Sequence, residues 1–494
     1  MEVHLALGSN IEPRAFYICR AVQLIGEMKG THLLATAHLY VSRPAGFEAE
    51  TLFLNTACTI RTILSPTDLL VALQGVEKVL GRLDPTVNRR SGRSDGYESR
   101  TIDIDILTYG DEVVCLRAPD LCIPHPRMAE RDFVMLPLRD LNRFVDCRDV
   151  PVRSLSHVLH RTTPLVRIHD DLSQECGVSE FRFEWGRRTY VMGIVNVTPD
   201  SFSDGGLYAD HQCAIGHAWR LLEAGADIID VGGESTRPGA RPGEVDAAEE
   251  QRRVLSVIEG LRRLFPSSKQ CCISVDTYRA ETALRAVRAG ADIVNDVSGG
   301  RWDPEMIPTV ARLGVPFIVT HSRGFPWNMH EGEFTSYGEA GVIHGVRSEL
   351  GASVAKALQG GIHRWNIIVD PGLGFAKTSE DNITLLTQCG KLLADGTVFP
   401  VLVGSSRKRF VSDILDKGGH RTPTSPTSPT SPTSPTSLDI KKDLRWGTAA
   451  TISAAIHAGA DIVRVHEVEE MRQVAMASDS IYRRMGLTGV PSAP

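Results

Sequence analysis

Asp103 and Asp105 are two carboxylates separated by a single residue within RTIDIDILTY, residues 100–109. Isoleucines alternate with the aspartates here, which is the period of a strand that buries one of its faces. Carboxylates at positions i and i+2 then lie on the same face, about 7 Å apart, and can each bind or share a Mg²⁺ ion. Most such pairs belong to a solvated strand face, so the pattern alone leaves both interpretations open.

The segment before this strand, GRLDPTVNRRSGRSDGYESR at 81–100, is rich in arginine. Clustered guanidinium groups repel one another unless an anion neutralises them. A triphosphate held through two metal ions would satisfy both the arginines and the paired carboxylates. A disordered basic loop is the alternative for the middle of the segment. Arg82 and Arg100, at its edges, are therefore the stronger candidates.

Polar residues also end a series of apolar runs in the second half of the chain. Three of these runs have similar sequences, AGADIID (224–230), AGADIVNDVSG (289–299) and AGADIVR (458–464). Apolar residues at helical spacing precede Gly290, which predicts a helix that ends at a glycine cap and turns tightly into a strand. The polar residues that close each strand then emerge at its C-terminal end.

Eight apolar runs of this kind alternate with helix-like segments, which predicts a parallel sheet covered on both faces and closed into a (β/α)₈ barrel. The runs are 189–199, 226–233, 271–277, 291–299, 316–322, 366–374, 399–406 and 460–468. Chemistry in such barrels lies at the C-terminal ends of the strands. Each polar residue there could alone be a helix cap or turn former. The candidates are Asn196, Asp230, Asp276, Asn295, His321, Asp370, Ser406, Lys408, Arg464 and His466.

Two kinds of side chain gather at these strand ends. Arg464 and His466 are two residues apart and project to the same side, and together with Lys408 they predict an anion site, as barrels often bind phosphate after strands seven and eight. Surface pairing of Arg464 and His466 with Glu467 and Glu469 is the alternative. The carboxylates and amides at 276, 295 and 370 would instead accept hydrogen bonds from a flat, nitrogen-rich ring.

In this half the chain carries, in order, GIVNVTPDSFSDGG, DVGGESTRPGA, SVDT, NDVSGG, DPGLGF, SSRK and RVH. The series resembles dihydropteroate synthase, which implies displacement of pyrophosphate from a dihydropterin by p-aminobenzoate, with Lys408, Arg464 and His466 as catalytic residues. One departure is THSRG at 320–324, where the family often has a methionine beside the histidine. The resemblance implies that Asp276, Asn295, Asp370 and Lys408 bind the pterin, that Asn196, Arg464 and His466 bind pyrophosphate with one Mg²⁺ on Asn196, and that Thr236, Arg237 and Ser406 lie near p-aminobenzoate.

The first half carries ALGSN (6–10), FLNTA (53–57), RTIDIDIL (100–107) and IPHPRMAERDFV (123–134). This set resembles hydroxymethyldihydropterin pyrophosphokinase, which implies an α+β ferredoxin-like fold and transfer of the β,γ-pyrophosphoryl group of ATP, with AMP released. The resemblance implies two Mg²⁺ on Asp103 and Asp105, catalysis by these and Arg100, ATP contacts from Gln74, Glu77, Arg82, Arg100, His125 and Arg131, and pterin contacts from Phe53, Asn55 and Phe133, with Phe53 in place of the family's frequent tyrosine.

The length and composition limit the number of domains and the classes of protein to which the chain can belong. At 494 residues and a formal net charge of -6, the chain has room for two or three domains and does not resemble a general nucleic-acid binder. Its ten cysteines include no CxxC pair, so neither a disulfide framework nor a zinc site is indicated, and a reducing compartment fits. We predict a kinase domain at 1–160, a linker at 161–187 and a barrel at 188–494 that contains a Pro-Thr-Ser insertion at 419–438.

The product of the first predicted reaction is the substrate of the second, so we interpret the chain as an enzyme for two consecutive steps of folate synthesis. A pterin-binding barrel that transfers methyl groups to corrinoid is one alternative. A scaffold without activity, docking through the Pro-Thr-Ser tract, is another, and deletion of 422–437 with little loss of either activity would argue against it. We expect a homodimer formed through the barrel, no membrane segment, and a cytoplasmic location unless an organellar presequence is missing.

Overall fold

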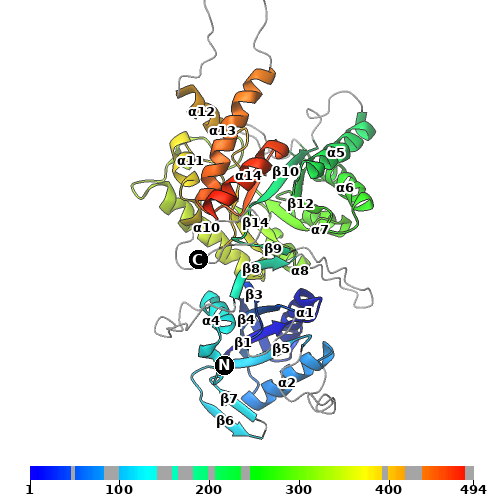
Figure 1. Ribbon diagram of the computed structural model, residues 1–494, viewed down its shortest axis with the longest axis vertical. Helices are drawn as coiled ribbons and strands as arrows, with labels where there is room; N and C mark the ends of the chain where they lie inside the picture. Colours follow the sequence, from blue (N-terminus) through cyan, green and yellow to red (C-terminus); the bar gives the residue numbers. More distant parts are fainter. Residues whose placement is uncertain are drawn as a thin grey trace, which may run out of the picture. The chain divides into compact units, whose positions relative to one another are not determined.

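The computed structural model describes residues 1–45, 51–82, 99–118, 120–141, 158–164, 182–197, 206–234, 245–391, 399–417 and 437–483. The chain forms two compact units (Figure 1). The first comprises Met1–Trp185 with Gly361–Asn366, and the second comprises Gly186–Gly360 with Ile367–Pro494. Among the described residues, no helix is both long and apolar enough to cross a membrane.

The first unit is built on an antiparallel sheet with the strand order β5-β1-β4-β3-β8-β9, and β2 pairs with β4. Its strands are β1 (Glu2–Ser9), β2 (Thr31–Thr36), β3 (Leu39–Ser42), β4 (Phe53–Thr62), β5 (Asp103–Tyr109), β8 (Val158–Pro164) and β9 (Arg182–Glu184). A separate hairpin consists of β6 (Val114–Arg117) and β7 (Asp120–Ile123). The helices are α1 (Arg14–Glu27), α2 (Pro66–Val79) and α4 (Asp132–Leu141).

Helices cover both faces of this sheet. The larger core packs side chains of α1 and α2, such as Ile18 and Leu73, against Leu5, Ile104 and Ile106 of the strands. A smaller cluster on the other face packs Val134 and its neighbours in α4 against β1, β4 and β5. The predicted α+β class and the alternation of β5 are therefore confirmed, since its isoleucines enter the larger core and its aspartates face the other way.

The second unit is an eight-stranded parallel sheet, ordered β15-β14-β13-β12-β11-β10-β17-β16. A parallel bridge between Val369 and Val401 joins its two ends, so the predicted barrel is confirmed. The strands are β10 (Tyr190–Asn196), β11 (Ile228–Gly232), β12 (Cys272–Asp276), β13 (Ile293–Asp296), β14 (Phe317–Thr320), β15 (Ile367–Asp370), β16 (Leu402–Val403) and β17 (Ile462–Val465). Nearly every strand position is buried, and most of the buried residues are apolar, as is typical of parallel sheets covered on both faces.

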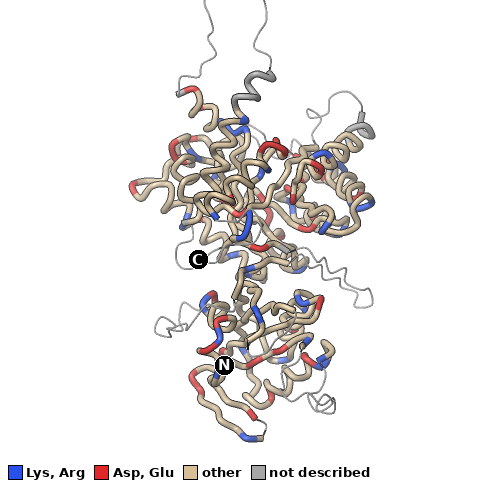
Figure 2. Tube along the Cα trace, viewed as in Figure 1, with Lys and Arg blue, Asp and Glu red and all other residues tan. Residues whose placement is uncertain are grey.

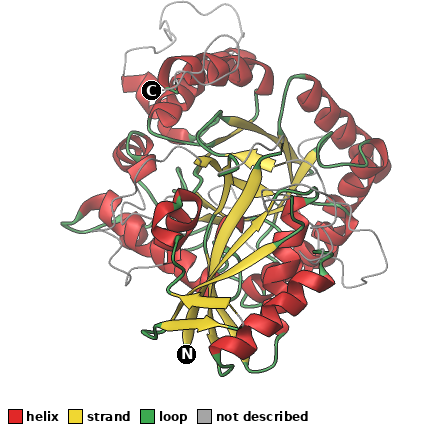
Figure 3. Cartoon of the chain, turned by 60° about the horizontal axis from the view of Figure 1, so that its bottom comes forward, coloured by secondary structure: helices red, strands yellow, loops and turns green. Residues whose placement is uncertain are grey.

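Helices surround these strands, as the red and yellow elements of Figure 3 show. They are α5 (Gly206–Glu223), α6 (Ala247–Leu264), α7 (Ala280–Ala289), α8 (Met306–Leu313), α9 (Gly332–Thr335), α10 (Gly341–Gln359), α11 (Ser379–Leu386), α12 (Arg409–Lys417), α13 (Ser437–His457) and α14 (Val468–Tyr482). The α7 helix ends at Gly290 with φ +126°, and a side chain there would also collide with Arg262. The recurring AGAD segments thus end helices as predicted.

The boundary between the units differs from the predicted one. Strands β8 and β9 lie at the two ends of the predicted linker, and β8 pairs with β3, so the first unit continues to Trp185. The first unit also includes Gly361–Asn366, although barrel residues flank this hexapeptide on both sides. Within it, Trp365 is 1% exposed in the larger core, and the Arg364 N–H donates to Thr36 Oγ1 (3.1 Å).

Positively and negatively charged residues are interspersed along both units (Figure 2). This agrees with the small negative net charge of the sequence. Most of the Pro-Thr-Ser insertion lies outside the described residues, which resume at Ser437, the first residue of α13.

Candidate active sites

A pocket lies over the α4 side of the first unit's sheet. Its wall along β1 includes Ala6 and Gly8. A Cβ atom at Gly8 would lie 3.0 Å from Asn55 Oδ1, so the absence of a side chain at Gly8 makes room for the Asn55 amide. The pocket brings together many of the residues predicted for the first reaction, namely Phe53, Asn55, Arg100, Asp103, Asp105, Arg131 and Phe133.

The two aspartates of β5 enter this pocket from the same face of the strand. Asp103 accepts hydrogen bonds from Arg100 Nη1 (2.6 Å) and forms an ion pair with Arg82 Nη1 (2.8 Å). Asp105 lies 3.9 Å from Arg131 Nη1. Burial, and then the charge of Asp103, raise the pKa of the Asp105 carboxyl. A cation near both carboxylates would relieve that repulsion.

Two carboxylates on one face fit Mg²⁺, which usually takes one or two protein carboxylates and completes its shell with water and phosphate oxygens. Within the described ranges, no group of three or more histidine, cysteine, aspartate or glutamate side chains is arranged to hold a metal. The donor set therefore suits an ion shared with a phosphate ligand better than one enclosed by protein.

Glu77 does not line the pocket, but it contacts β5, the strand that carries the two aspartates. Its carboxylate accepts a hydrogen bond from the Ile104 N–H (2.8 Å) and pairs with Arg82. Burial raises the pKa of Glu77 to about 7, against the opposing charge of Arg82. Four residues predicted to contact ATP do not line the pocket, namely Gln74, Glu77, Arg82 and His125. Gln74 is exposed on α2, and the backbone N–H of His125 donates to Leu107 O (2.9 Å).

In the second unit, Arg464 joins carboxylates from two other strands at the C-terminal end of the barrel. Its Nε–H donates to Asp230 Oδ2 (2.6 Å) and its Nη2–H donates to Asp276 Oδ2 (2.7 Å). The Asn295 amide donates to the same oxygen of Asp230 (3.2 Å). Burial raises the pKa of Asp276 to about 7, although Arg464 opposes this. The cation predicted for pyrophosphate therefore also contacts a carboxylate predicted for the pterin.

Asp370 and Lys408 meet at the turn that follows β15. Asp370 Oδ1 accepts a hydrogen bond from the Gly372 N–H (2.7 Å), and Lys408 Nζ donates to Leu373 O. Lys408 Nζ also lies 4.5 Å from the centre of the Phe375 ring. Burial lowers the pKa of Lys408 to about 8, partly offset by Asp370 and Asp276. These charges act on one another, so the predicted pterin residues share one site.

His466 and Ser406 lie together at the rim. Ser406 Oγ and His466 Nδ1 are 3.0 Å apart, and Arg407 forms an ion pair with Glu467. Among the described contacts, Arg464 pairs with Asp230 and Asp276 and not with Glu467 or Glu469, the surface alternative. Asn196 is the last residue of β10, opposite Gly232 of β11. Thr236 and Arg237 lie outside the described residues.

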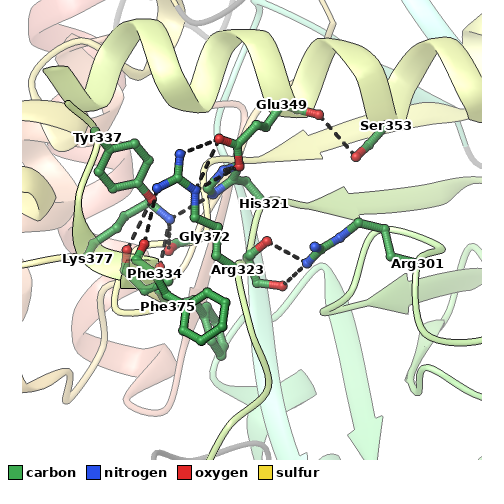
Figure 4. A network of polar contacts seen from close by, with 12 residues as sticks. Arg301, His321, Arg323, Phe334, Tyr337, Glu349, Ser353, Gly372, Phe375 and Lys377 are labelled. Carbon is green, nitrogen blue, oxygen red and sulfur yellow. Dashed lines mark hydrogen bonds and ion pairs between the residues drawn. The ribbon is translucent and has the colours of Figure 1, made fainter. Parts of the chain in front are cut away.

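A buried polar network lies behind the turn, as Figure 4 shows. Lys377 Nζ donates to Gly372 O (3.0 Å) and Phe375 O (2.8 Å) and contacts His321 Nδ1 (2.9 Å). His321 Nε2 lies 3.1 Å from Glu349. Burial, and then Lys377, lower the pKa of His321 to about 3, so the ring is neutral and donates to Glu349. Lys377 thus holds the backbone turn that follows Asp370.

The same network accounts for the unusual THSRG segment. The Arg323 guanidinium pairs with Glu349 and lies 3.9 Å from the centre of the Tyr337 ring. Ser322 Oγ, next to His321, donates to Val297 O (3.0 Å) and accepts from Arg301 (2.7 Å). Neither Lys377 nor Glu349 was predicted to be a site residue from the sequence. Lys377 lies two residues after the motif DPGLGF, in DPGLGFAK, and this position next to a site motif could have indicated a role for it.

Comparisons with known proteins agree with this division. Residues 4–143 match the 7,8-dihydro-6-hydroxymethylpterin-pyrophosphokinase family, and residues 192–466 match the pterin binding enzyme family. The mitochondrial folate synthesis bifunctional protein of Pisum sativum is 36% identical over 98% of this chain and 90% of its own length. The folic acid synthesis protein fol1 of Pneumocystis carinii is 38% identical, and this chain spans 60% of that protein.

Solved structures resemble the chain in the same way. A Clostridium difficile dihydropteroate synthase crystallised with pteroic acid is 37% identical over 61% of this chain and 99% of its own, with a TM-score of 0.51. The wild-type Plasmodium falciparum HPPK-DHPS with pteroate covers 97% of both chains at 18% identity and a TM-score of 0.71, which supports the fold. The chain therefore belongs to the bifunctional folate synthesis enzymes, in which a hydroxymethyldihydropterin pyrophosphokinase domain is followed by a dihydropteroate synthase barrel.

Proposed function

We propose that the pocket of the first unit and the strand ends of the barrel catalyse the two reactions in turn. The first transfers the β,γ-pyrophosphoryl group of ATP to 6-hydroxymethyl-7,8-dihydropterin and releases AMP. The second condenses that pyrophosphate ester with p-aminobenzoate to give 7,8-dihydropteroate and pyrophosphate. The observation that carries this assignment is that Asp103 and Asp105 share one pocket with Asn55, Phe53 and Phe133.

In the first site, Asp103 and Asp105 would hold two Mg²⁺ ions, which would neutralise the charge on the transferring group. Arg82 and Arg100, which lie beside Asp103, would contact phosphate oxygens. Phe53 and Phe133 would stack on the pterin, and the Asn55 amide would hydrogen-bond to its edge. Positioning and charge neutralisation suffice for this reaction, so no protein nucleophile is required.

In the second site, Asp276, Asn295 and Asp370 would accept hydrogen bonds from the pterin, with Lys408 beside them. Arg464 and His466 would stabilise the charge that develops on the leaving pyrophosphate, and Asn196 would hold one Mg²⁺ beside it. Ser406, Thr236 and Arg237 are proposed for p-aminobenzoate. Because Arg464 pairs with Asp230 and Asp276, we infer that its side chain exchanges part of this pairing for the ligand's phosphates.

A single reaction mixture tests the assignment. The chain is supplied with ATP, Mg²⁺, hydroxymethyldihydropterin and p-aminobenzoate, and AMP, pyrophosphate and dihydropteroate are measured. Omission of p-aminobenzoate should stop pyrophosphate release while AMP formation continues. Release of pyrophosphate that does not depend on p-aminobenzoate, or methyl transfer to a corrinoid, would support a different barrel reaction.

Binding of the pterin to the barrel should weaken as the pH falls. Asp276 has a pKa raised to about 7, so it loses its charge and part of its capacity to accept hydrogen bonds below that pH. We expect affinity to fall by up to about tenfold per pH unit between about pH 7 and pH 6, as for one titrating group. Calorimetric titration with a dihydropterin measures it, and Asp276→Asn should remove this acidic limb. Lys408, with its pKa lowered to about 8, should govern the alkaline limb.

We propose that two chains associate through the barrel. Large apolar side chains are exposed on α13 and α14, among them Trp446 (78%), Met476 (59%) and Ile481 (67%). Large apolar side chains exposed on two helices that pack against each other are typical of an interface. We expect Ile481→Asp to shift the chain from dimer to monomer in sedimentation velocity. Ile63→Asp, at a still more exposed isoleucine of the first unit (86%), is the matched control, and a monomeric parent chain would contradict the proposal.

The cytoplasmic location stays a prediction, which a fluorescent fusion of the full-length protein in its own cells would test. The names of the matched relatives include both mitochondrial proteins and proteins without that label. The role of the Pro-Thr-Ser tract also stays open to the deletion described above, with both activities expected to persist.

A further inference from the structure

The hairpin formed by β6 and β7 carries two cysteines on directly opposite positions. Cys115 pairs with Cys122 in the register of the two strands, and the two sulfur atoms lie 3.6 Å apart. Both thiols are free and both residues are exposed. The sequence did not indicate this pair, because six residues separate the cysteines and no CxxC pattern marks them.

The backbone of the hairpin already suits a bond between them. Opposite residues of an antiparallel pair have Cα atoms about 4.5–5.5 Å apart, and disulfides form at about 4.4–6.8 Å. The neighbours Leu121 and Ile123 are buried, at 7% and 1% exposure, while Cys122 between them faces outward. The sulfurs can therefore approach by side-chain rotation on the outer surface, without a change in the core.

The other described cysteines lack this combination. Five of them are buried, and burial raises the pKa of the thiols of Cys19, Cys58, Cys271 and Cys389 to about 12. Their burial also keeps a dissolved disulfide from reaching their sulfur atoms. Cys213 is exposed, and the structure shows no cysteine of the described residues paired with it. Cys115 and Cys122 thus stand apart by exposure and proximity together.

We propose that Cys115 and Cys122 are a redox modification site that forms a reversible disulfide across the hairpin. The oxidant is a small disulfide such as oxidised glutathione. The thiolate of one cysteine attacks it and releases one glutathione thiolate, and the second cysteine then displaces the other glutathione from the mixed disulfide. The two cysteines lose two electrons and two protons, and the oxidant becomes two molecules of glutathione.

This site lies close in sequence to the first active site. Ile123 ends β7, and His125, two residues later, donates its N–H to Leu107 O of β5 (2.9 Å). A bond between 115 and 122 would restrain the hairpin that leads into this segment. The chemistry does not depend on either enzyme activity, so its failure would leave the proposed function untouched.

The test uses the full-length chain, reduced and then equilibrated in glutathione buffers of increasing oxidised fraction. Free thiols are trapped by alkylation, and tryptic peptides are measured by mass spectrometry. We expect a species with Cys115 joined to Cys122, lighter by two hydrogens, that predominates while Cys213 is still mostly unmodified. Dithiothreitol should reverse it. In Cys115→Ser, Cys122 should carry glutathione instead, and Cys213→Ser should leave the bond unchanged.

Three results would overturn the proposal. They are glutathione on both cysteines without a bond between them, a bond from either cysteine to another cysteine or another chain, and thiols that remain alkylatable in every buffer. Because Cys115 and Cys122 are both exposed, their serine variants should fold normally. Circular dichroism of each variant checks this.

Discussion

Asp103→Asn and Asp105→Asn should each reduce ATP-dependent AMP formation on the order of 10²–10³-fold, the usual effect of removing one group that stabilises transition-state charge. Both carboxylates face the pocket, and each change removes one of the two charges available to Mg²⁺. Asp103→Asn also removes the negative charge that pairs with Arg100 and Arg82. Steady-state rates at several Mg²⁺ concentrations measure the loss.

The barrel provides an internal control for these variants. When the pterin pyrophosphate is supplied directly, dihydropteroate formation should proceed at the parent rate, because the substitutions lie in the other unit. Asp68→Asn, at an acidic residue in the first turn of α2, is a matched change that should preserve AMP formation. Normal Mg²⁺-dependent AMP formation in both Asp103→Asn and Asp105→Asn would exclude the assigned site.

Arg464→Ala should slow the condensation on the order of 10²–10³-fold and destabilise the barrel by about 3–5 kcal/mol. The first effect follows from loss of a cation beside the leaving group. The second follows because Asp230 is fully buried and shares the guanidinium with Asp276, so both would lose their neutralising charge. Single-turnover rates with supplied pterin pyrophosphate and urea unfolding of the parent and variant measure the two effects.

Two further variants separate stability from catalysis. Asp230→Asn combined with Arg464→Met removes one buried charge together with the cation, so it should recover part of the lost stability while condensation stays slow. His466→Ala, at the side chain beside Ser406, should slow condensation more than it weakens pterin binding. Unchanged turnover in Arg464→Ala or in His466→Ala would rule out the corresponding role.

Periodic patterns in the sequence predicted much of the fold. The alternation around Asp103 and Asp105 placed both carboxylates on the face opposite Ile104 and Ile106, and the structure confirms it. Eight apolar runs located the barrel's strands, and three of these runs follow a glycine-capped AGAD segment. Both patterns come from short-range geometry, which a sequence records directly.

Contacts between distant residues were harder to predict. Arg464 lies 234 positions from Asp230 and 188 from Asp276 in the sequence. The residues next to Arg464, in the motif RVH, do not indicate which carboxylates it contacts. The predicted boundary between the kinase domain and the linker, at residues 160 and 161, divides strand β8, which pairs with β3 in the structure. Its place depends on the rest of the sheet, as often holds for β-structure.

The hexapeptide Gly361–Asn366 has a consequence for how the two enzymes could be separated. Its indole, Trp365, occupies the core of the kinase, yet the codons for it lie within the stretch that encodes the synthase. If the gene were divided after residue 185, the kinase would lack Trp365 in its core. The synthase would retain a loop whose tryptophan no longer had that core to pack in. The first unit therefore depends on a segment encoded within the second, so the two activities are joined by structure as well as by one continuous chain.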